Sequence, residues 1–318
     1  KLVKEMLRRD TNHPCILFWD NGNEGGFNYD LDAEFARYDP QNRPVLHPWE
    51  VFSGIDTDHY ESYESTQNKL KGPVPYLPTE FLHGLYDGGH GAGLEDYWKI
   101  MKEPPYGAGG FLWVFADEGA VRTDQQGQID TDGNHAPDGI VGPHHEKEGS
   151  YYTIRQLWSP VQVSMDAVTD AFDGTIPVEN CYDFTNLNAV TFTWQLVDFA
   201  AAVSEKSGHI VRKEAKTSGP DIAVGRTGTL RLNLPADWKS YDGLYLTATD
   251  PAGQDVWTWS WPLKSRTQMA AVDTDTPAIQ KINAVTKESA VIVTADNCQF
   301  MFSAADGLLR KVSCDGRD

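Results

Sequence analysis

Residues 12–24, NHPCILFWDNGNE, decide the fold of this chain. They contain a short apolar run that is followed, a few residues later, by a glutamate. Residues 75–84, PYLPTEFLHG, repeat the arrangement around a second glutamate. An apolar run that ends in a polar turn is how an α/β barrel delivers side chains to its mouth, where active sites of that fold gather. The two segments therefore predict a barrel with Glu24 and Glu80 at the same end of its sheet.

A pair of carboxylates is the usual machinery for cleaving a glycosidic bond, with one group as acid/base and the other as nucleophile. Each glutamate also has a purely structural interpretation. Glu24 could lie at a helix start, where the helix dipole stabilises a negative charge. Glu80 could be a surface residue that follows a strand. The pair together favours the chemistry of sugar cleavage.

Composition narrows the classes of partner. The chain has 318 residues and a net charge of −19, from 46 acidic and 27 basic residues. Such a surface repels phosphate backbones and anionic lipid, which argues against nucleic acid and membrane partners. No apolar run reaches the roughly 18 residues that span a bilayer. The many aromatic residues suit carbohydrate binding, although most are expected in the core.

Residues 1 to about 160 alternate short apolar runs with helical patterns, which is typical of βα units. The pattern predicts a helix over Leu94–Met101 and the end of an amphipathic helix at Lys1–Arg9. The expected fold is a partial (β/α)8 TIM barrel that contributes about strands 4–8. The expected strands are Cys15–Trp19, Pro44–His47, Gly54–Tyr60, Val74–Thr79 and Gly110–Phe115.

From about residue 161 apolar and polar residues alternate with a period of two. This pattern predicts an immunoglobulin-like β-sandwich over 161–268. Residues 269–318 are expected to form a linker and the beginning of a further β-sandwich domain. An open half barrel would leave strand edges and an apolar interior facing water, so we expect a chain truncated at both ends. The expected strands here are Val190–Val197, Leu230–Leu234, Leu244–Thr249, Val256–Trp261, Ala290–Thr294 and Gln299–Phe302.

The four cysteines show neither a CxxC motif nor zinc spacing. Cys15 falls in an expected core strand, which predicts a buried thiol. Cys298 and Cys314 could pair, and their pairing is left open. Residue 1 falls within a helical pattern rather than a signal peptide, so the sequence does not indicate a compartment.

Three motifs in order resemble glycoside hydrolase family 2, in particular its β-galactosidase-like members. Asn12-His13-Pro14 with Gly22-Asn23-Glu24 is similar to the signature around the family's acid/base residue. Pro78-Thr79-Glu80-Phe81-Leu82-His83 is similar to the nucleophile segment. Gly109-Gly110-Phe111-Leu112-Trp113 is similar to the eighth barrel strand. The resemblance covers the second half of the catalytic barrel and the immunoglobulin-like domain that follows it.

The resemblance implies roles for six residues. Glu24 would be the acid/base and Glu80 the nucleophile, while Asn23 would bond the sugar 2-hydroxyl. Tyr60 would orient the nucleophile, although it could be a core tyrosine. His83 would bond sugar hydroxyls, and Trp113 would form the floor of the pocket, followed by a non-proline cis peptide. For Asn23, His83 and Trp113 the structural alternatives are a turn, a packed histidine and barrel core.

Residues near other strand ends are candidates for the pocket lining, namely His47, Trp49, Asp58, His59, Asp87 and His90. The family often carries Mg, Na or Ca near the active site, but its usual magnesium ligands would precede residue 1, so no cofactor is assigned. Residues 130–134 resemble the start of a calcium loop but are interpreted as a turn. Trp257, Trp259 and Trp261 share one strand face and are expected to pack rather than to bind sugar.

Two functions are compatible with the sequence. The first is a retaining β-glycosidase that resembles β-galactosidases and acts on terminal sugars of oligo- or polysaccharides. The second is a non-catalytic carbohydrate-binding or scaffold fragment, inactive without an N-terminal part. The expected partner is a carbohydrate, and a homo-oligomer is left open. The sequence does not name the sugar.

Overall fold

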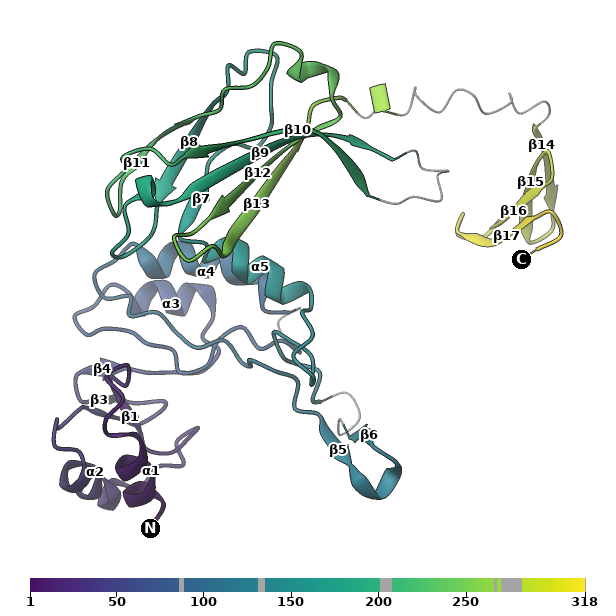
Figure 1. Cartoon of the computed structure of the whole chain (residues 1–318). Helices are drawn as coiled ribbons and strands as arrows, with labels where there is room; N and C mark the ends of the chain where they lie inside the picture. Colours follow the sequence, from purple (N-terminus) through teal and green to yellow (C-terminus); the bar gives the residue numbers. More distant parts are fainter. Residues whose placement is uncertain (86–88, 131–134, 201–207, 266–267, 270–281, 318) are drawn as a thin grey trace. The chain divides into compact units, whose positions relative to one another are not determined.

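The structure is a computed structural model that describes residues 1–85, 89–130, 135–200, 208–265, 268–269 and 282–317. The chain forms two compact units, Lys1–Gln162 and Val163–Asp318 (Figure 1). The first unit mixes helices with short strands, and the second is built mainly of strands. In the part of the chain that is described, no helix has the length and apolar character needed to cross a bilayer.

The first unit is organised by parallel pairing. Strand β1 (Trp19–Asp20) pairs in parallel with β2 (Val45–Leu46). Isolated parallel bridges then join three further segments, with His59 opposite Glu80 and Phe81 opposite Leu112. Parallel strands need a crossover between them, so successive segments end at the same edge of the sheet. The remaining short strands of this unit are β3 (Val51–Phe52), β4 (Ile55–Asp56), β5 (Ala120–Arg122) and β6 (Gln128–Asp130).

Helices cover these segments and supply the apolar core. They are α1 (Leu2–Asp10), α2 (Asp32–Tyr38), α3 (Tyr63–Lys69), α4 (Gly91–Lys102) and α5 (Gly149–Leu157). The predicted helices over 94–101 and 1–9 are confirmed by α4 and α1. Leu94 and Met101 of α4 are buried against Tyr76 and Phe81. In α1 the apolar contact is made by Leu7, which packs with Trp19 and Phe35.

The prediction of a strand over Cys15–Trp19 was wrong at its start. Residues 13–16 form turns, in which His13 N donates to Asp10 O and Ile16 N donates to His13 O. Pairing begins only at Trp19, whose N–H donates to Pro44 O. Cys15 therefore lies before the strand and is exposed, so the prediction of a buried thiol was also wrong.

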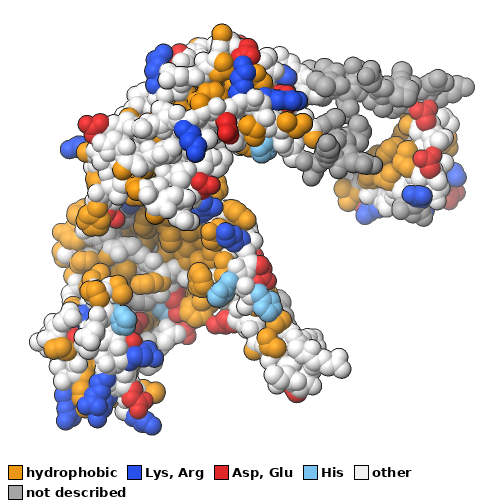
Figure 2. Space-filling view, in the orientation of Figure 1, with side chains coloured by type: hydrophobic (Ala, Val, Ile, Leu, Met, Phe, Trp, Pro, Cys, Tyr) orange, Lys and Arg blue, Asp and Glu red, His pale blue; other side chains and the backbone are white. Residues whose placement is uncertain are grey.

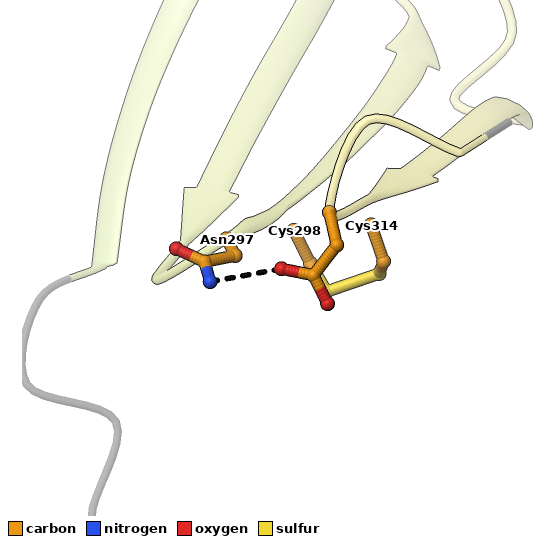
Figure 3. Close-up of a disulfide and its surroundings, with 4 residues drawn as sticks. Asn297, Cys298 and Cys314 are labelled. Carbon is orange, nitrogen blue, oxygen red and sulfur yellow. Dashed lines mark hydrogen bonds between the residues drawn. A yellow bond between two sulfur atoms is a disulfide. The ribbon is translucent and has the colours of Figure 1, made fainter.

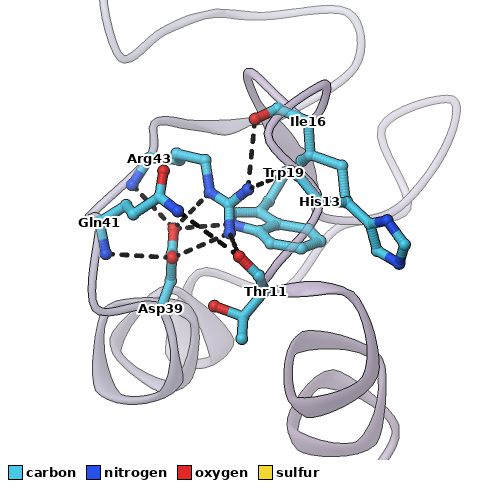
Figure 4. A network of polar contacts seen from close by, with 7 residues as sticks. All are labelled: Thr11, His13, Ile16, Trp19, Asp39, Gln41 and Arg43. Carbon is cyan, nitrogen blue, oxygen red and sulfur yellow. Dashed lines mark hydrogen bonds and ion pairs between the residues drawn. The ribbon is translucent and has the colours of Figure 1, made fainter.

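A buried ion pair fixes the chain that leads into β1 (Figure 4). Arg43 donates to both carboxylate oxygens of Asp39 at 3.0 Å, and its guanidinium stacks over the Trp19 ring. The indole N–H of Trp19 donates to Asp39 at 2.9 Å. Arg43 also donates to the backbone oxygens of His13 and Ile16. The guanidinium holds the pKa of Asp39 well below its usual range, so this stabilisation is present at neutral pH and is lost as the pH falls.

The described part of the second unit contains three sheets, and two of them are formed by strands before residue 263. One has the order β10-β9-β12-β13 and the other has the order β11-β8-β7. Burial alternates along β12, and Leu244, Leu246 and Ala248 are fully buried. Trp261 is buried and donates to Met165 O, as expected of a packing residue. The strands are β7 (Val161–Val163), β8 (Thr175–Asn180), β9 (Thr191–Phe199), β10 (His209–Ser218), β11 (Thr227–Arg231), β12 (Gly243–Thr249) and β13 (Asp255–Pro262).

The last described segment is a four-stranded antiparallel meander of β14 (Ile282–Lys287), β15 (Ala290–Ala295), β16 (Cys298–Ser303) and β17 (Leu309–Cys314). Cys298 and Cys314 are directly opposite on β16 and β17 and form a disulfide (Figure 3). The pairing that the sequence left open is therefore present. Asn297 donates to Asp315 beside the disulfide at 2.9 Å.

Apolar side chains reach the surface of both units (Figure 2). Within the first unit Leu17, Phe111 and Phe115 are each more than half exposed. Among the described residues β1 pairs only with β2, so the other edge of β1 is free.

Replacing Arg43 should destabilise the first unit. Removing one partner of a buried ion pair costs about 3–5 kcal/mol, and we expect Arg43→Met to lose about 3 kcal/mol. Hydrogen exchange measured by mass spectrometry should speed up over residues 11–20 and stay unchanged over 243–262. Arg37→Met is the matched control, because the Arg37–Glu34 pair is exposed and should contribute under about 1 kcal/mol. Equal effects of the two variants would contradict the assigned role of Arg43.

Candidate active site

Glu24 and Glu80 lie together, although they are far apart in the chain. Glu24 stands on the turn after β1, and Glu80 stands opposite His59 in a parallel bridge. One side-chain oxygen of each glutamate and one ring nitrogen of His59 lie within 4.8 Å of one another. The Glu24 side chain is 55% exposed and that of Glu80 only 12%. The Glu24 carboxylate is therefore exposed to solvent, whereas the Glu80 carboxylate is largely buried.

Tyr60 holds the less exposed carboxylate. Its hydroxyl donates to Glu80 Oε2 at 2.6 Å, and its backbone N donates to Glu80 O at 3.0 Å. A short hydrogen bond to a charged acceptor is among the strong ones. The bond fixes the position of the Glu80 side chain.

His83 and Trp113 lie beside Tyr60. The His83 ring centroid is 5.5 Å from that of Tyr60 and 6.4 Å from that of Trp113. The peptide bond between Trp113 and Val114 is cis, as the resemblance implies. Tyr60, Glu80, His83 and Trp113 thus form one contiguous surface of the first unit.

Asp138, which the sequence did not single out, supports this surface. Its carboxylate is buried, accepts the indole N–H of Trp113 at 3.1 Å and lies 3.7 Å from His83 Nε2. Asp138 is followed by Gly139, a pair that is typical of an exposed turn. Nothing in the local pattern predicts that this carboxylate is buried behind the indole.

Asn23 is placed on the turn next to Glu24. Its backbone oxygen accepts from Gly26 N at 2.6 Å, which shapes the turn, and its side chain is exposed. Gly22 has a φ of +102°, and a side chain there would meet Phe27. Glycine is required here because the turn folds back on itself.

Four residues around the site have left-handed backbone conformations although none is glycine. The φ angles are +48° for Glu24, +72° for Trp49, +53° for Tyr60 and +52° for Leu82. This region of conformation is uncommon for residues with a side chain. Such residues gather at functional sites, where the surrounding structure imposes them.

The other candidates for the pocket lining divide into packed and open residues. His47 is fully buried, lies 2.9 Å from Asp32 and stacks on Phe52, so it serves packing. His90 is fully buried against the backbone oxygen of Trp113, and burial lowers its pKa.

Among the rest, Asp58 forms an ion pair with Lys69 at 3.3 Å. Trp49 is half exposed and packs edge-on to His59, with ring centroids 5.7 Å apart. Asp87 lies outside the described residues, and so does most of the 130–134 turn.

Asp20 is a further acidic group that the sequence did not single out. Its pKa is raised to about 6, chiefly because the surrounding protein reduces its solvation, and in part because of the negative charge of Glu80. The Asn21 N–H and His47 act in the opposite direction. Solvent still reaches the Asp20 side chain, which lines a recess of about 550 Å³ together with Asn21, Gly22 and α1.

Glu24, His59 and Glu80 are the described residues that could hold a metal ion. Magnesium and calcium, which the resemblance implies, take oxygen ligands. The imidazole nitrogen of His59 at the centre of this group fits those ions poorly. The group as it stands therefore does not match a magnesium or calcium site.

Comparison with known proteins shows which family the first unit resembles. Residues 1–138 match the model of the glycosyl hydrolases family 2 TIM barrel domain. The chain is 26% identical over 338 residues to a β-galactosidase of Priestia megaterium, and the match covers 96% of the chain and 31% of that protein. A β-galactosidase of Streptococcus thermophilus is 21% identical over 368 residues, covering 99% of the chain and 33% of the relative.

Solved structures of similar proteins include an exo-chitosanase of Amycolatopsis orientalis and a β-glucuronidase of Parabacteroides merdae. The TM-scores are 0.37 and 0.35, at 10% and 13% identity. Each match covers 96% of this chain, and 45% and 44% of the other chain.

Parallel strand ends that bring two carboxylates together are found in the barrel class of glycoside hydrolases, which this part of the chain resembles. Residues 1–138 are similar to the TIM barrel domain of glycoside hydrolase family 2. The chain as a whole resembles the β-galactosidases of that family and spans about a third of their length.

The raised pKa of Asp20 can be measured directly. In a carbon-13 NMR titration of side-chain carboxyls we expect Asp20 to titrate near pH 6, with Asp20→Asn assigning the signal. Because the folded-state pKa is raised, the stability from this group is present below about pH 4 and is lost as the pH rises through about 6. Glu80→Gln should lower the midpoint, because it removes a nearby negative charge. A midpoint near 4, unmoved by Glu80→Gln, would contradict the assignment.

Proposed function

We propose that the protein hydrolyses terminal β-glycosidic bonds of oligo- or polysaccharides with retention of configuration, and that it is β-galactosidase-like. The observation that carries the proposal is the approach of Glu24 and Glu80, whose nearest oxygens lie within 4.8 Å. Retaining enzymes hold their two carboxyl groups about 5–5.5 Å apart, and inverting enzymes about 6.5–9.5 Å apart. The short separation leaves no room for a water between carboxylate and sugar, which supports direct attack.

In the first step of this mechanism Glu80 attacks the anomeric carbon while Glu24 gives its proton to the leaving oxygen. The bond to the leaving group breaks, and a covalent glycosyl ester forms on Glu80. In the second step Glu24 removes a proton from water, and the water oxygen displaces Glu80 from the same carbon. Both carboxyl groups return to their starting protonation, so the cycle is balanced.

The neighbours of the two glutamates support this division of roles. Tyr60 donates to Glu80 and so holds the nucleophile in position. Glu24 is open to solvent, as an acid that must later activate water needs to be. Trp113 would supply an aromatic floor for the sugar and His83 a hydrogen bond to it. Asn23, exposed on the same turn as Glu24, would bond the 2-hydroxyl in the transition state.

The domain organisation belongs to the same proposal. Residues 1–160 would be the second half of a barrel of catalytic type, and 161–268 an immunoglobulin-like sandwich. Residues 269–318 would begin a further β-domain. Because the chain spans about a third of the β-galactosidases it matches and the outer edge of β1 is free among the described residues, we expect little turnover from these 318 residues alone.

A non-catalytic carbohydrate-binding or scaffold role is the second candidate. The free edge of β1 favours it for the isolated chain. It does not account for the convergence of Glu24, Glu80 and Tyr60, which a binding surface does not require. Activity measurements on the longest natural polypeptide that contains this chain distinguish the two candidates.

Substitution of the two glutamates should abolish turnover of nitrophenyl β-glycosides by that polypeptide. Removing an acid/base group costs about 10²–10⁴-fold, and we expect Glu24→Gln to fall in this range. Glu80→Gln should lose at least as much, because no ester can form. Glu5→Gln, a change at an exposed glutamate of α1, is the matched control and should keep full activity. Turnover that survives in Glu80→Gln would end the nucleophile assignment.

The stereochemistry of the reaction gives a separate test. Proton NMR of the first-formed sugar from a β-glycoside should show the β-anomer before mutarotation, because two displacements restore the starting configuration. Appearance of the α-anomer first would mean that a water attacks directly and that Glu80 acts as a base.

A further inference from the structure

Neither ring nitrogen of His59 has a hydrogen-bond partner among the residues that the structure describes. The His59 side chain is only 2% exposed. A buried polar group without a partner costs about 1–3 kcal/mol. Packing against Trp49 and Tyr60 accounts for the position of the ring. It does not account for two unsatisfied nitrogens.

The Nδ1 atom of His59 faces both carboxylates. It lies 3.5 Å from Glu80 Oε2 and 3.9 Å from Glu24 Oε1. Both separations exceed a good hydrogen bond, which is about 2.7–3.2 Å. They are close to the spacing of ligands around one ion, because bonds of about 2.1 Å at tetrahedral angles set neighbouring ligand atoms about 3.4 Å apart.

The ligand types favour a transition metal over a hard cation. Imidazole suits zinc, copper, iron and nickel, whereas magnesium and calcium prefer oxygen alone. Two carboxylates and one imidazole give three ligands, and the exposure of Glu24 leaves a side open for a water in the fourth position. Zinc with three protein ligands and a water is a known arrangement.

We propose that Glu24, His59 and Glu80 together bind one divalent transition-metal ion of the zinc type. The ion would satisfy Nδ1 of His59 and offset the charge of two adjacent carboxylates. Only side-chain rotations of Glu24 are needed to bring its oxygen to ligand distance, because the His59 to Glu80 spacing already fits. Binding of the ion is independent of the proposed function.

The consequence for turnover does rest on the proposed function. A metal on Glu24 and Glu80 would occupy the proton donor and the nucleophile at once, so it would compete with the sugar. The site would then act as an inhibitory switch set by the free concentration of zinc.

Isothermal titration of the 318-residue chain with zinc chloride tests the binding. We expect a site of one ion per chain that magnesium chloride does not fill. Loss of outer-shell partners alone costs metal sites about 10–100-fold in affinity, so His59→Gln and Glu80→Gln should each weaken binding by at least about tenfold. His144→Gln, at an exposed histidine, is the matched control and should bind as the parent chain does.

Cobalt substitution gives a readout that does not depend on the folding of a variant. Cobalt(II) added to the unaltered chain should develop visible absorption of a low-symmetry site, and zinc should displace it. No binding of either ion, or affinity for zinc that is equal in His59→Gln and His144→Gln, would overturn the proposal. Binding without competition against substrate in an active polypeptide would refute only the inhibitory role. A protein without glycosidase activity that still binds zinc through His59 would refute only the proposed function.

Discussion

The parallel alignment of consecutive segments is the constraint on which the rest of the first unit depends. Parallel segments joined by crossovers all end at one edge, so whatever follows each segment is brought to the same place. The bridge between His59 and Glu80 aligns one pair of ends, and β1 delivers the turn that carries Glu24. Arg43 and Asp39 fix the segment that leads into β1. The site exists because these contacts leave little freedom in register.

Negative charge is concentrated at this edge with few groups to balance it. Glu24 and Glu80 approach closely, Asp20 stands near enough for Glu80 to raise its pKa, and Asp138 is buried behind Trp113. The groups beside this charge are Tyr60, which donates a hydrogen bond to Glu80, and His59, whose Nδ1 lies 3.5 Å from Glu80 Oε2. Crowded carboxylates are how an enzyme separates an acid from a nucleophile. The same crowding makes the edge a place where a cation would be stabilised.

Local pattern was sufficient where the physical signal is local. The apolar period of α4 predicted its helix, and period-two alternation predicted β12, β13 and β15. The pattern failed at Cys15, because Pro14 and its neighbours favour turns that no short apolar run reveals. It also missed β8 and β10, and Asp138, whose burial depends on an indole 25 residues away in the chain. Contacts between residues that are far apart in the chain cannot be predicted from a short stretch of sequence.

The amino-acid sequence by itself determined the candidate glutamates, the order of the motifs around them and the division between an α/β part and a β-rich part. Those features follow from the spacing of residues that are close in the sequence, and this spacing is visible before the chain folds. Only the tertiary structure decided that His59 shares one space with Glu24 and Glu80, and that His47 is packed instead of lining the site. Distances between segments are set by pairing register and by side-chain packing, and these form only when the chain folds.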